Sequence, residues 1–217
     1  MISQRLDPAQ RQRRPGHDRT HLRPEREAVL FLARWFKAPH RMGAVVPSGR
    51  SLARAMAREV DPGSGGSVIE LGGGTGSITR ALLERGLAPH RLIVVERDRT
   101  LAALLRKRFP GVRVVRGDAS RLTELLRPLQ VTSADAVVSS LPLLSMPKPV
   151  RRRIVEESFA FLGERGPFVQ FTYGVVAPFS AAALGLAAEV ADRVWANLPP
   201  AAVWRFRRLA APQAQVA

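Results

Sequence analysis

Several residue types are rare or missing in this 217-residue chain, which has no cysteine, one tyrosine and four histidines. Without cysteine there are neither disulfides nor cysteine-ligated metal sites. No two histidines have the spacing of metal ligands, so we expect no bound metal. No apolar run approaches the roughly 20 residues that a membrane-spanning helix needs, and the polar, arginine-rich start is unlike a signal peptide. These absences favour a cytoplasmic protein.

Acidic residues are also scarce: 18 Asp and Glu stand against 34 Lys and Arg, which gives a net charge of +16. Such a charge predicts an anionic partner, and RNA, DNA and an anionic membrane surface all qualify. Residues 1–60 carry 13 basic and 5 acidic side chains, half of the net charge in little more than a quarter of the chain. The N-terminal part is therefore the expected docking surface.

This N-terminal part divides into a leader and a helical region. Residues 1–23 are polar and basic without hydrophobic periodicity, which is typical of a disordered arm. Residues 24–60 are expected to form amphipathic helices, the first over Glu25–Lys37. Its end carries the four residues Arg34, Trp35, Phe36 and Lys37. Such a helix either packs on the domain, as most amphipathic helices do, or lies in a membrane interface.

From residue 61 to residue 210 the pattern alternates between apolar strands and amphipathic helices. The expected strands are 68–71, 91–96, 112–116, 135–140 and 167–173, and the expected helices are 51–59, 77–86, 99–108, 120–128 and 149–162. The strands are too apolar for a sheet with one wet face, so we expect an α/β fold of three layers with helices on both faces of a mostly parallel sheet. An alanine-rich helix is expected up to Leu186, then a hairpin of two edge strands near 190–197 and 203–207. Residues 211–217 are a flexible tail.

The sequence Glu70-Leu-Gly-Gly-Gly-Thr-Gly76 follows the first apolar strand and precedes a helix. Glycines at such a turn let the backbone approach a nucleotide-like ligand closely. The spacing differs from the dinucleotide fingerprint, because Ser77 stands where that pattern has its third glycine. It resembles motif I of the class I S-adenosylmethionine (SAM) methyltransferases. The candidate cofactor residues of this motif are Glu70, Gly72, Gly73, Gly74, Thr75 and Gly76.

The next two strands also end in acidic residues. Glu96 stands where an acidic side chain accepts hydrogen bonds from ribose hydroxyls, although it could instead be a surface carboxylate paired with Arg97 or Arg99. Asp118 could accept the exocyclic amine of adenine while the Ala119 N–H meets the ring, although Gly-Asp alone is more often a turn. Ligands of open α/β sheets bind at the carboxyl ends of the strands, where all these residues fall. Arg97 and Ser139 complete the candidate cofactor set.

The fourth strand leads into Ser140-Leu-Pro-Leu143. Methyltransferases that act on nucleobase amino groups commonly have Asn or Asp at the first position and an aromatic residue at the fourth, which stacks on the flipped base. Here Ser140 and Leu143 replace them, so the pocket favours an apolar acceptor that is not planar. The fifth strand places Gln170 and Tyr173 near the same mouth, although Tyr173 could also be a strand tyrosine with its hydroxyl in water.

Four segments together resemble the bacterial phospholipid N-methyltransferases of the PmtA type: Gly43–Arg50, Glu70–Gly76, Ser140–Leu144 and Gln170–Gly174. The match spans roughly residues 25–208. The resemblance implies a seven-stranded Rossmann-like methyltransferase fold with an N-terminal helical extension. It also implies SAM as methyl donor, S-adenosylhomocysteine as product, and stepwise conversion of phosphatidylethanolamine towards phosphatidylcholine. It further implies docking to the inner face of the membrane through the helix that carries Arg34, Trp35, Phe36 and Lys37.

The resemblance also suggests roles in the acceptor site. Tyr173, Ser140 and Leu141 are the catalytic candidates, with the Tyr173 ring and hydroxyl and the Ser140 carbonyl facing the amine. Ser48, Arg50 and Gln170 are candidates for binding the substrate and its phosphate, and Arg50 could equally be a plain surface charge. Two other functions remain open, an rRNA adenine N6-dimethyltransferase and a non-catalytic basic protein that binds RNA or membrane. The lipid hypothesis expects no nucleic acid partner.

Overall fold

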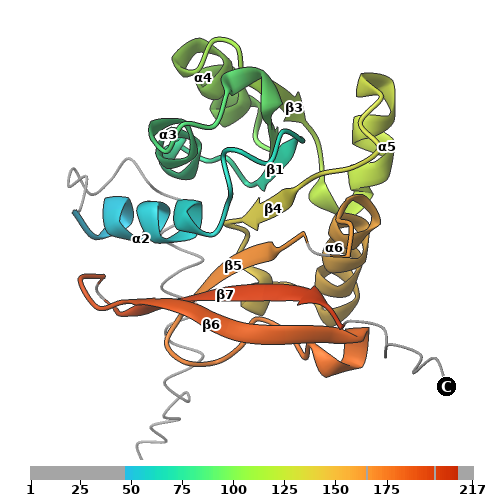
Figure 1. Cartoon of the computed structure of the whole chain (residues 1–217). Coiled ribbons are helices and arrows are strands. Elements are labelled where there is room, and N and C mark those ends of the chain that lie inside the picture. Colours follow the sequence, from blue (N-terminus) through green and yellow to red (C-terminus); the bar gives the residue numbers. More distant parts are fainter. Residues whose placement is uncertain (1–46, 165, 198, 210–217) are drawn as a thin grey trace, which may run out of the picture.

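A seven-stranded sheet forms the centre of the computed structural model, which describes residues 47–164, 166–197 and 199–209 (Figure 1). The strand order is β3-β2-β1-β4-β5-β7-β6. The strands are β1 Val68–Leu71, β2 Leu92–Glu96, β3 Arg113–Arg116, β4 Ala136–Ser139, β5 Phe168–Tyr173, β6 Leu186–Val194 and β7 Ala201–Arg208. The first five strands are parallel, and β7 pairs antiparallel with both β5 and β6. The predicted sheet with its C-terminal hairpin is therefore confirmed.

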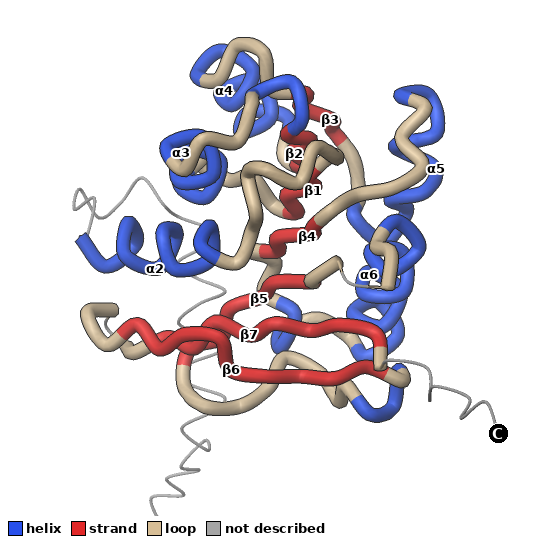
Figure 2. Tube along the Cα trace, in the orientation of Figure 1, coloured by secondary structure: helices blue, strands red, loops and turns tan. Residues whose placement is uncertain are grey.

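Helices cover both faces of the sheet, as the apolar strands predict (Figure 2). On one face lie α2 Pro47–Arg58, α3 Ser77–Glu84 and α4 Arg99–Arg108, and on the other lie α5 Leu122–Leu126 and α6 Lys148–Phe161. Short 3-10 turns are η1 Pro89–Arg91, η2 Ala119–Arg121, η3 Arg127–Leu129, η4 Leu143–Ser145 and η5 Ala182–Leu184. Alternation along each strand supplies both cores: Val94 packs on the α2–α4 side, whereas Ile93 and Val95 pack on the α5–α6 side.

The strand order reverses between β1 and β4. The chain moves from β1 outward to β2 and β3, then returns to place β4 on the other side of β1. Such a switch point separates the loops that follow its two strands, and it is where ligands of open α/β sheets bind. The loop after β1 is the glycine motif, and the loop after β4 begins at Ser140. The topology thus brings the two predicted halves of the site to one edge.

Helix α2 belongs to the core of this domain. Ala55 and Met56 are fully buried among residues of α3 and the sheet. At its C-terminal end Arg58 pairs with Asp192 of β6. The structure therefore places residues on both sides of the expected boundary at residue 60 in one folded domain. The helix also begins earlier than the predicted Ser51, since Pro47 is already helical and proline is compatible with a first helical turn.

The alanine-rich helix that we expected before Leu186 is wrong. Only Ala182–Leu184 form a 3-10 turn, and Gly185, with φ +64°, ends it in the left-handed region. β6 begins at Leu186, which is buried and pairs with Arg208 of β7. The high helix propensity of alanine amounts to tenths of a kcal/mol per residue, so strand pairing and burial outweigh it.

The expected first helix, with Arg34, Trp35, Phe36 and Lys37, lies outside the described residues, as do the leader 1–23 and the tail 211–217. Within the described part of the chain, no helix is long and apolar enough to cross a membrane.

Candidate active site

The glycine motif forms a tight turn between β1 and α3. The Gly72 N–H donates to the Val95 carbonyl at 2.8 Å, and the Gly76 N–H donates to the Gly73 carbonyl at 2.8 Å. Gly72, Gly74 and Gly76 all have positive φ, which L side chains rarely adopt. The first bond fixes the turn to the end of β2, so the turn and the second strand share one edge of the sheet.

The glycines of this turn meet different surroundings. A Cβ on Gly73 would lie 2.4 Å from Val94 Cγ1, and one on Gly76 would lie 2.3 Å from the Phe109 ring. These two are needed for packing against β2 and α4. A Cβ on Gly74 would meet only the Gly72 carbonyl oxygen, at 3.9 Å. Gly74 therefore faces open space, and its backbone is the part of the turn that a ligand can approach.

Glu96, at the end of β2, is buried and reaches the glycine turn. Its Oε2 accepts from the Gly74 N–H at 2.9 Å, and its Oε1 accepts from the Asp98 N–H at 2.8 Å. An ionised carboxylate offers about four acceptor positions, so each oxygen keeps one for another donor. This excludes a surface carboxylate paired with Arg97 or Arg99, and it leaves Glu96 able to bind a diol beside Gly74.

Glu70 lies under the turn and is fully buried. Its Oε2 accepts from the Thr79 hydroxyl at 2.7 Å, while its Oε1 has no partner among the described residues. Burial raises the pKa of Glu70 to about 8, opposed by hydrogen bonds from Thr79 and assisted by the charge of Glu96. At neutral pH Glu70 is thus a neutral acid with one buried, unpartnered oxygen beneath the turn.

Asp118 and Ala119 lie beyond β3 on the same edge. The Asp118 Oδ1 accepts from the backbone N–H and the hydroxyl of Ser120, which lower the pKa of Asp118. Its Oδ2 lies 3.9 Å from Arg97, whose side chain is largely exposed. The Gly117 N–H donates to the Glu96 carbonyl at 3.1 Å, and this bond places Asp118 beside the ribose-binding candidate. The second oxygen of Asp118 remains an acceptor, as the adenine role requires.

Thr75 takes part in the turn through its backbone, because its carbonyl accepts from Arg108 of α4 at 2.6 Å. The open face of Gly74, the spare acceptors of Glu96 and the orphaned oxygen of Glu70 together fit a ligand that carries a ribose and an amine. SAM carries both. No group of three or more potential metal ligands occurs in the described part of the chain.

The loop after β4 closes over the glycine turn. The Ser140 N–H donates to the Leu71 carbonyl at 3.0 Å, and the Ser140 hydroxyl donates to the Gly72 carbonyl. Ser139 is fully buried, and its hydroxyl accepts from the Leu141 N–H at 3.3 Å. The Ser140 side chain therefore holds the two loops together. Its carbonyl oxygen accepts no hydrogen bond from the described residues, so this oxygen is the part of Ser140 left for an acceptor.

Gln170 of β5 fixes the next peptide. Its amide Nε2 donates to the Leu141 carbonyl at 3.1 Å and to the Phe171 carbonyl at 2.9 Å. The Leu141 carbonyl also accepts from the Leu143 N–H at 2.8 Å, so both of its lone pairs are used. Gln170 is almost completely buried, and its Oε1 has no partner among the described residues. Its geometry suits positioning of the loop more than direct contact with a phosphate.

Tyr173 ends β5 beside this loop. Burial raises the pKa of Tyr173, and a hydrogen bond with the Asn197 side chain opposes that shift. Phe171 meets the Tyr173 ring edge-on, with centroids 5.4 Å apart and an interplanar angle of 89°. Tyr173 is therefore half-buried, and the Asn197 side chain contacts its hydroxyl. Tyr173 stays protonated at neutral pH and above.

A small pocket lies beside Gln170 and Tyr173, with a volume of about 30 Å³. Its lining is Leu141, Pro142, Leu143, Leu144, Ser145, Gln170, Phe171, Thr172, Tyr173 and Pro178. This space holds little more than a water molecule, so the pocket has to open for an acceptor. Leu143 is buried, and the wall contributed by the loop after β4 is aliphatic. It offers no stacking platform at the position where base-modifying methyltransferases have one.

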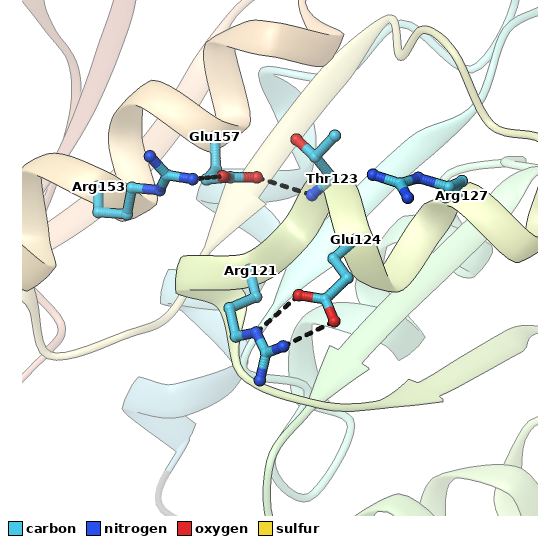
Figure 3. A pocket seen from close by; sticks show the side chains of 6 residues that line it. All are labelled: Arg121, Thr123, Glu124, Arg127, Arg153 and Glu157. Carbon is cyan, nitrogen blue, oxygen red and sulfur yellow. Dashed lines mark hydrogen bonds and ion pairs between the residues drawn. The ribbon is translucent and has the colours of Figure 1, made fainter.

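A larger cavity, of about 570 Å³, lies between α5 and α6 (Figure 3). Its charged walls pair with each other: Arg121 with Glu124 at 2.6 Å, and Arg153 with the buried Glu157 at 2.7 Å. Glu157 also accepts from the Thr123 N–H at 2.7 Å. These pairs involve four of the five charged residues that line the cavity, Arg127 being the fifth, and none of the predicted site residues lines it.

Two predicted substrate residues lie on α2. Arg50 is exposed in the first turn, which is compatible with either a phosphate contact or a plain surface charge. Ser48 also falls within α2, but its side chain lies outside the described part of the structure. Among the described residues, Arg50 has no hydrogen bond or ion pair with the residues that line the acceptor pocket.

Comparison with known proteins agrees with this geometry. Residues 68–166 match a family model described as a methyltransferase domain. An ornithine lipid N-methyltransferase from Singulisphaera acidiphila is 37% identical over 150 residues, which cover 68% of this chain and 78% of that protein. The chain belongs to the bacterial lipid N-methyltransferases of the class I SAM-dependent superfamily. The protein is a SAM-dependent N-methyltransferase, which uses SAM as cofactor and releases S-adenosylhomocysteine.

Other relatives share less of the molecule. A ribosomal RNA small subunit methyltransferase A from Chlorobium chlorochromatii is 32% identical over 99 residues, 43% of this chain and 34% of that protein. A TehB-like SAM-dependent methyltransferase from Corynebacterium glutamicum superposes with a TM-score of 0.55 at 19% identity, over 85% of this chain and all of that one. This structural likeness shows the Rossmann-like methyltransferase fold and nothing more specific.

Three residues that matter to the site were missed in the sequence. Asn197 is buried and meets Tyr173 from the β6–β7 turn, and Thr79 holds Glu70 from within α3. Trp204 of β7 donates to the Thr172 hydroxyl at 2.8 Å. The sequence pattern predicts a helix around Thr79, but it gives little sign that Thr79 contacts Glu70. Asn197 and Trp204 approach the site only because β7 pairs with β5, which their local sequence does not indicate.

Proposed function

We propose that this N-methyltransferase transfers methyl groups to the primary amine of phosphatidylethanolamine at a membrane surface. The mono- and dimethyl products would return as substrates on the way to phosphatidylcholine. The observation that supports this most is the acceptor pocket, where aliphatic residues after β4 and Tyr173 line one space. Ser140 directly precedes the first lining residue, and its carbonyl accepts no hydrogen bond from the described residues. An amine on a flexible headgroup suits such a pocket, whereas a planar base lacks a stacking partner in the loop.

The cofactor, when bound, supplies an electrophilic methyl group on a sulfonium. Gly74 and Glu96 would hold it at the glycine turn, and Asp118 with Ala119 would hold its adenine. The chain then has to orient one nitrogen towards that methyl group, and such positioning supplies most of the acceleration when the leaving group is good. The Ser140 hydroxyl contributes by tying the acceptor loop to the cofactor turn.

The acceptor amine has to be neutral before it reacts. An amine with the pKa of lysine costs roughly 4–5 kcal/mol to deprotonate at pH 7 in water. Transfer into the largely apolar pocket disfavours the charged form and reduces this cost. The Ser140 carbonyl and the Tyr173 hydroxyl would accept hydrogen bonds from the amine, and neither has to be a strong base. The rings of Tyr173 and Phe171 would stabilise the cationic product by cation–π contact.

The membrane part of the proposal is supported by charge. The net charge of +16 favours an anionic surface, and the predicted helix over Glu25–Lys37 would dock there with Arg34, Trp35, Phe36 and Lys37. Such docking would place the enzyme on the inner face of the cell membrane. Arg50, exposed at the start of α2, is our candidate for the lipid phosphate, together with Ser48.

A second acceptor has a specific observation in its favour. The relative from Singulisphaera acidiphila is an ornithine lipid N-methyltransferase, and the chain covers most of it. An ornithine headgroup also offers an amine to the same pocket. The rRNA alternative has less support, because the rRNA methyltransferase relative matches less than half of this chain.

The test offers methyl-labelled SAM to the full chain with four acceptors in parallel: phosphatidylethanolamine vesicles, ornithine lipid vesicles, 16S rRNA and buffer. We expect label in the phosphatidylethanolamine fraction, with mono- and dimethyl products in sequence. Label in ornithine lipid alone would move the acceptor to the second candidate. Label in rRNA alone would overturn the lipid proposal.

A further inference from the structure

Two exposed apolar loops border the acceptor pocket. The loop after β5 carries Val175 and Val176, which are 70% and 50% exposed, and the β6–β7 turn carries Trp195, which is 73% exposed. They are the three most exposed large apolar side chains at this edge of the sheet. Exposed apolar residues that gather beside an active site indicate contact with a partner.

The strand register brings the two loops together. Tyr173 pairs with Ala201 of β7, and Ala201 pairs with Val194 of β6. The Gly174 N–H then donates to the Pro200 carbonyl at 3.0 Å. Both loops therefore start at the same level, one residue beyond Tyr173 and one residue beyond Val194. Figure 1 shows the β6–β7 turn as the tip of the hairpin at one end of the sheet.

Charge distinguishes these loops from the rest of the chain. Charged residues make up 24% of the sequence, yet the 23 residues from 166 to 188 and the 11 residues from 194 to 204 contain none. Arg193 and Arg205 flank the second stretch, and Arg193 is exposed. A surface of this kind can enter an apolar medium without desolvating an ion. An exposed arginine at its border suits a layer of phosphates.

We infer that the β5–η5 loop and the β6–β7 turn form a membrane-insertion edge, with Trp195 in the headgroup region of the bilayer and Val175 and Val176 beside it. Tryptophan prefers this region because its ring is apolar and its N–H is polar. The occupant is a lipid surface because the patch combines apolar side chains, two stretches without acidic residues and an exposed arginine, Arg193, at the border of the second stretch. This inference rests on the proposed function, since it explains how a lipid amine reaches Tyr173 without leaving the bilayer.

The insertion edge is distinct from the predicted N-terminal helix. It belongs to the folded catalytic domain, and it lies next to the pocket whose small volume requires opening. Pro178, which lines that pocket, belongs to the same loop as Val175 and Val176. Contact of the loop with lipid would therefore move a wall of the acceptor pocket.

The test compares Trp195→Ala and Val175→Ser/Val176→Ser with a matched control, Leu209→Ala, in the full chain. Leu209 is 60% exposed but follows the far end of β7, at the opposite edge of the sheet. Binding is measured by co-sedimentation with phosphatidylglycerol vesicles without SAM. We expect Trp195→Ala to raise the lipid concentration for half-binding about tenfold, in line with the loss of one large buried apolar side chain, and Leu209→Ala to leave it unchanged.

A second measurement reads Trp195 directly. In a Trp35→Phe/Trp204→Phe background Trp195 is the remaining tryptophan. Its emission should shift to the blue on binding vesicles, and brominated lipids should quench it. Unchanged emission, or half-binding of Trp195→Ala equal to that of the unmodified chain, would overturn the insertion edge. Neither readout needs methyl transfer. If vesicle binding depends on Trp195 but the lipid substrate assay gives no methylated lipid, the result counts against the proposed function alone.

Discussion

The two sides of the switch point differ in how firmly the structure holds them. On the cofactor side, backbone and carboxylate bonds join β1, β2 and the glycine turn, and the open face at Gly74 is already formed. On the acceptor side, the pocket between the β4 loop and β5 has a volume of only about 30 Å³, and half of its lining residues are aliphatic. The donor site is thus preorganised, whereas the acceptor site has to open. A methyltransferase that takes its substrate from a membrane benefits from this arrangement, because lipid contact can control the opening.

The largest effect is expected from a bulky side chain placed in the open face of the glycine turn. Gly74→Leu should weaken SAM binding by about 100-fold or more, because the new side chain occupies the open face of the turn. Isothermal titration with SAM measures this effect. The matched control is Gly65→Leu, since Gly65 also has positive φ and open space around it but lies outside the site.

Both glycine substitutions should cost stability by similar amounts, of the order of 1–2 kcal/mol for a left-handed L-residue. Only Gly74→Leu should lose SAM. Equal SAM binding by the two variants would mean that the turn does not seat the cofactor.

The next effect probes the acceptor side. Tyr173→Ala should lower kcat for phosphatidylethanolamine about 100-fold, and Tyr173→Phe about tenfold, because the first removes ring and hydroxyl and the second the hydroxyl alone. SAM affinity should not change in either variant, which separates the two sides of the switch point. Full activity of Tyr173→Phe would exclude a role for the hydroxyl, and unchanged turnover of Tyr173→Ala would exclude the site.

A smaller effect is expected at Gln170, which positions the acceptor loop. Gln170→Leu removes both bonds from Nε2 but also the unpartnered Oε1, so the free energy of unfolding should change little. We expect kcat to fall about tenfold because the Leu141 peptide is no longer held in place, while the KM for SAM stays unchanged. A parallel loss of thermal stability and activity would instead indicate a purely structural role.

The smallest effect on catalysis is expected at Glu70. Its substitution should instead change how the free energy of unfolding depends on pH. Its folded pKa of about 8 exceeds its usual value of 4.5. Between these values the unfolded chain loses a proton that the folded protein keeps, so stability decreases as pH rises, by up to about 1.4 kcal/mol per pH unit. Glu70→Gln should flatten this dependence in urea unfolding at pH 5.5 and 7.5. Parallel pH profiles for both proteins would contradict the raised pKa.

The sequence predicted where the cofactor candidates lie in the fold, because their signals are local. Gly74, Glu96 and Asp118 each follow an apolar strand, and a parallel sheet necessarily brings such strand ends to one edge. The acceptor side depends on pairing between distant strands. Asn197 reaches Tyr173 only through β7, and the alanine-rich segment before Leu186 follows the pairing of β6 against its own helix propensity. Local patterns contain neither fact.

The two sides also differ in what their residues contribute. Ser140 was predicted as a catalytic residue, and the structure divides it into a hydroxyl that holds Gly72 and a carbonyl that is free. Gln170 was predicted to bind substrate, and the structure shows that its amide Nε2 donates to the Leu141 carbonyl. In both cases the residue was found at the site, but the sequence could not distinguish a group that touches the acceptor from one that holds the loop.

The most direct test of the central claim is a competition in one vessel. The full chain receives SAM with a deuterated methyl group, together with phosphatidylethanolamine vesicles and 16S rRNA, and mass spectrometry locates the label. We predict monomethyl-phosphatidylethanolamine that carries the deuterated methyl, with unlabelled adenine in the RNA. Label on adenine with unlabelled lipid would contradict the assignment of a lipid amine to this acceptor site.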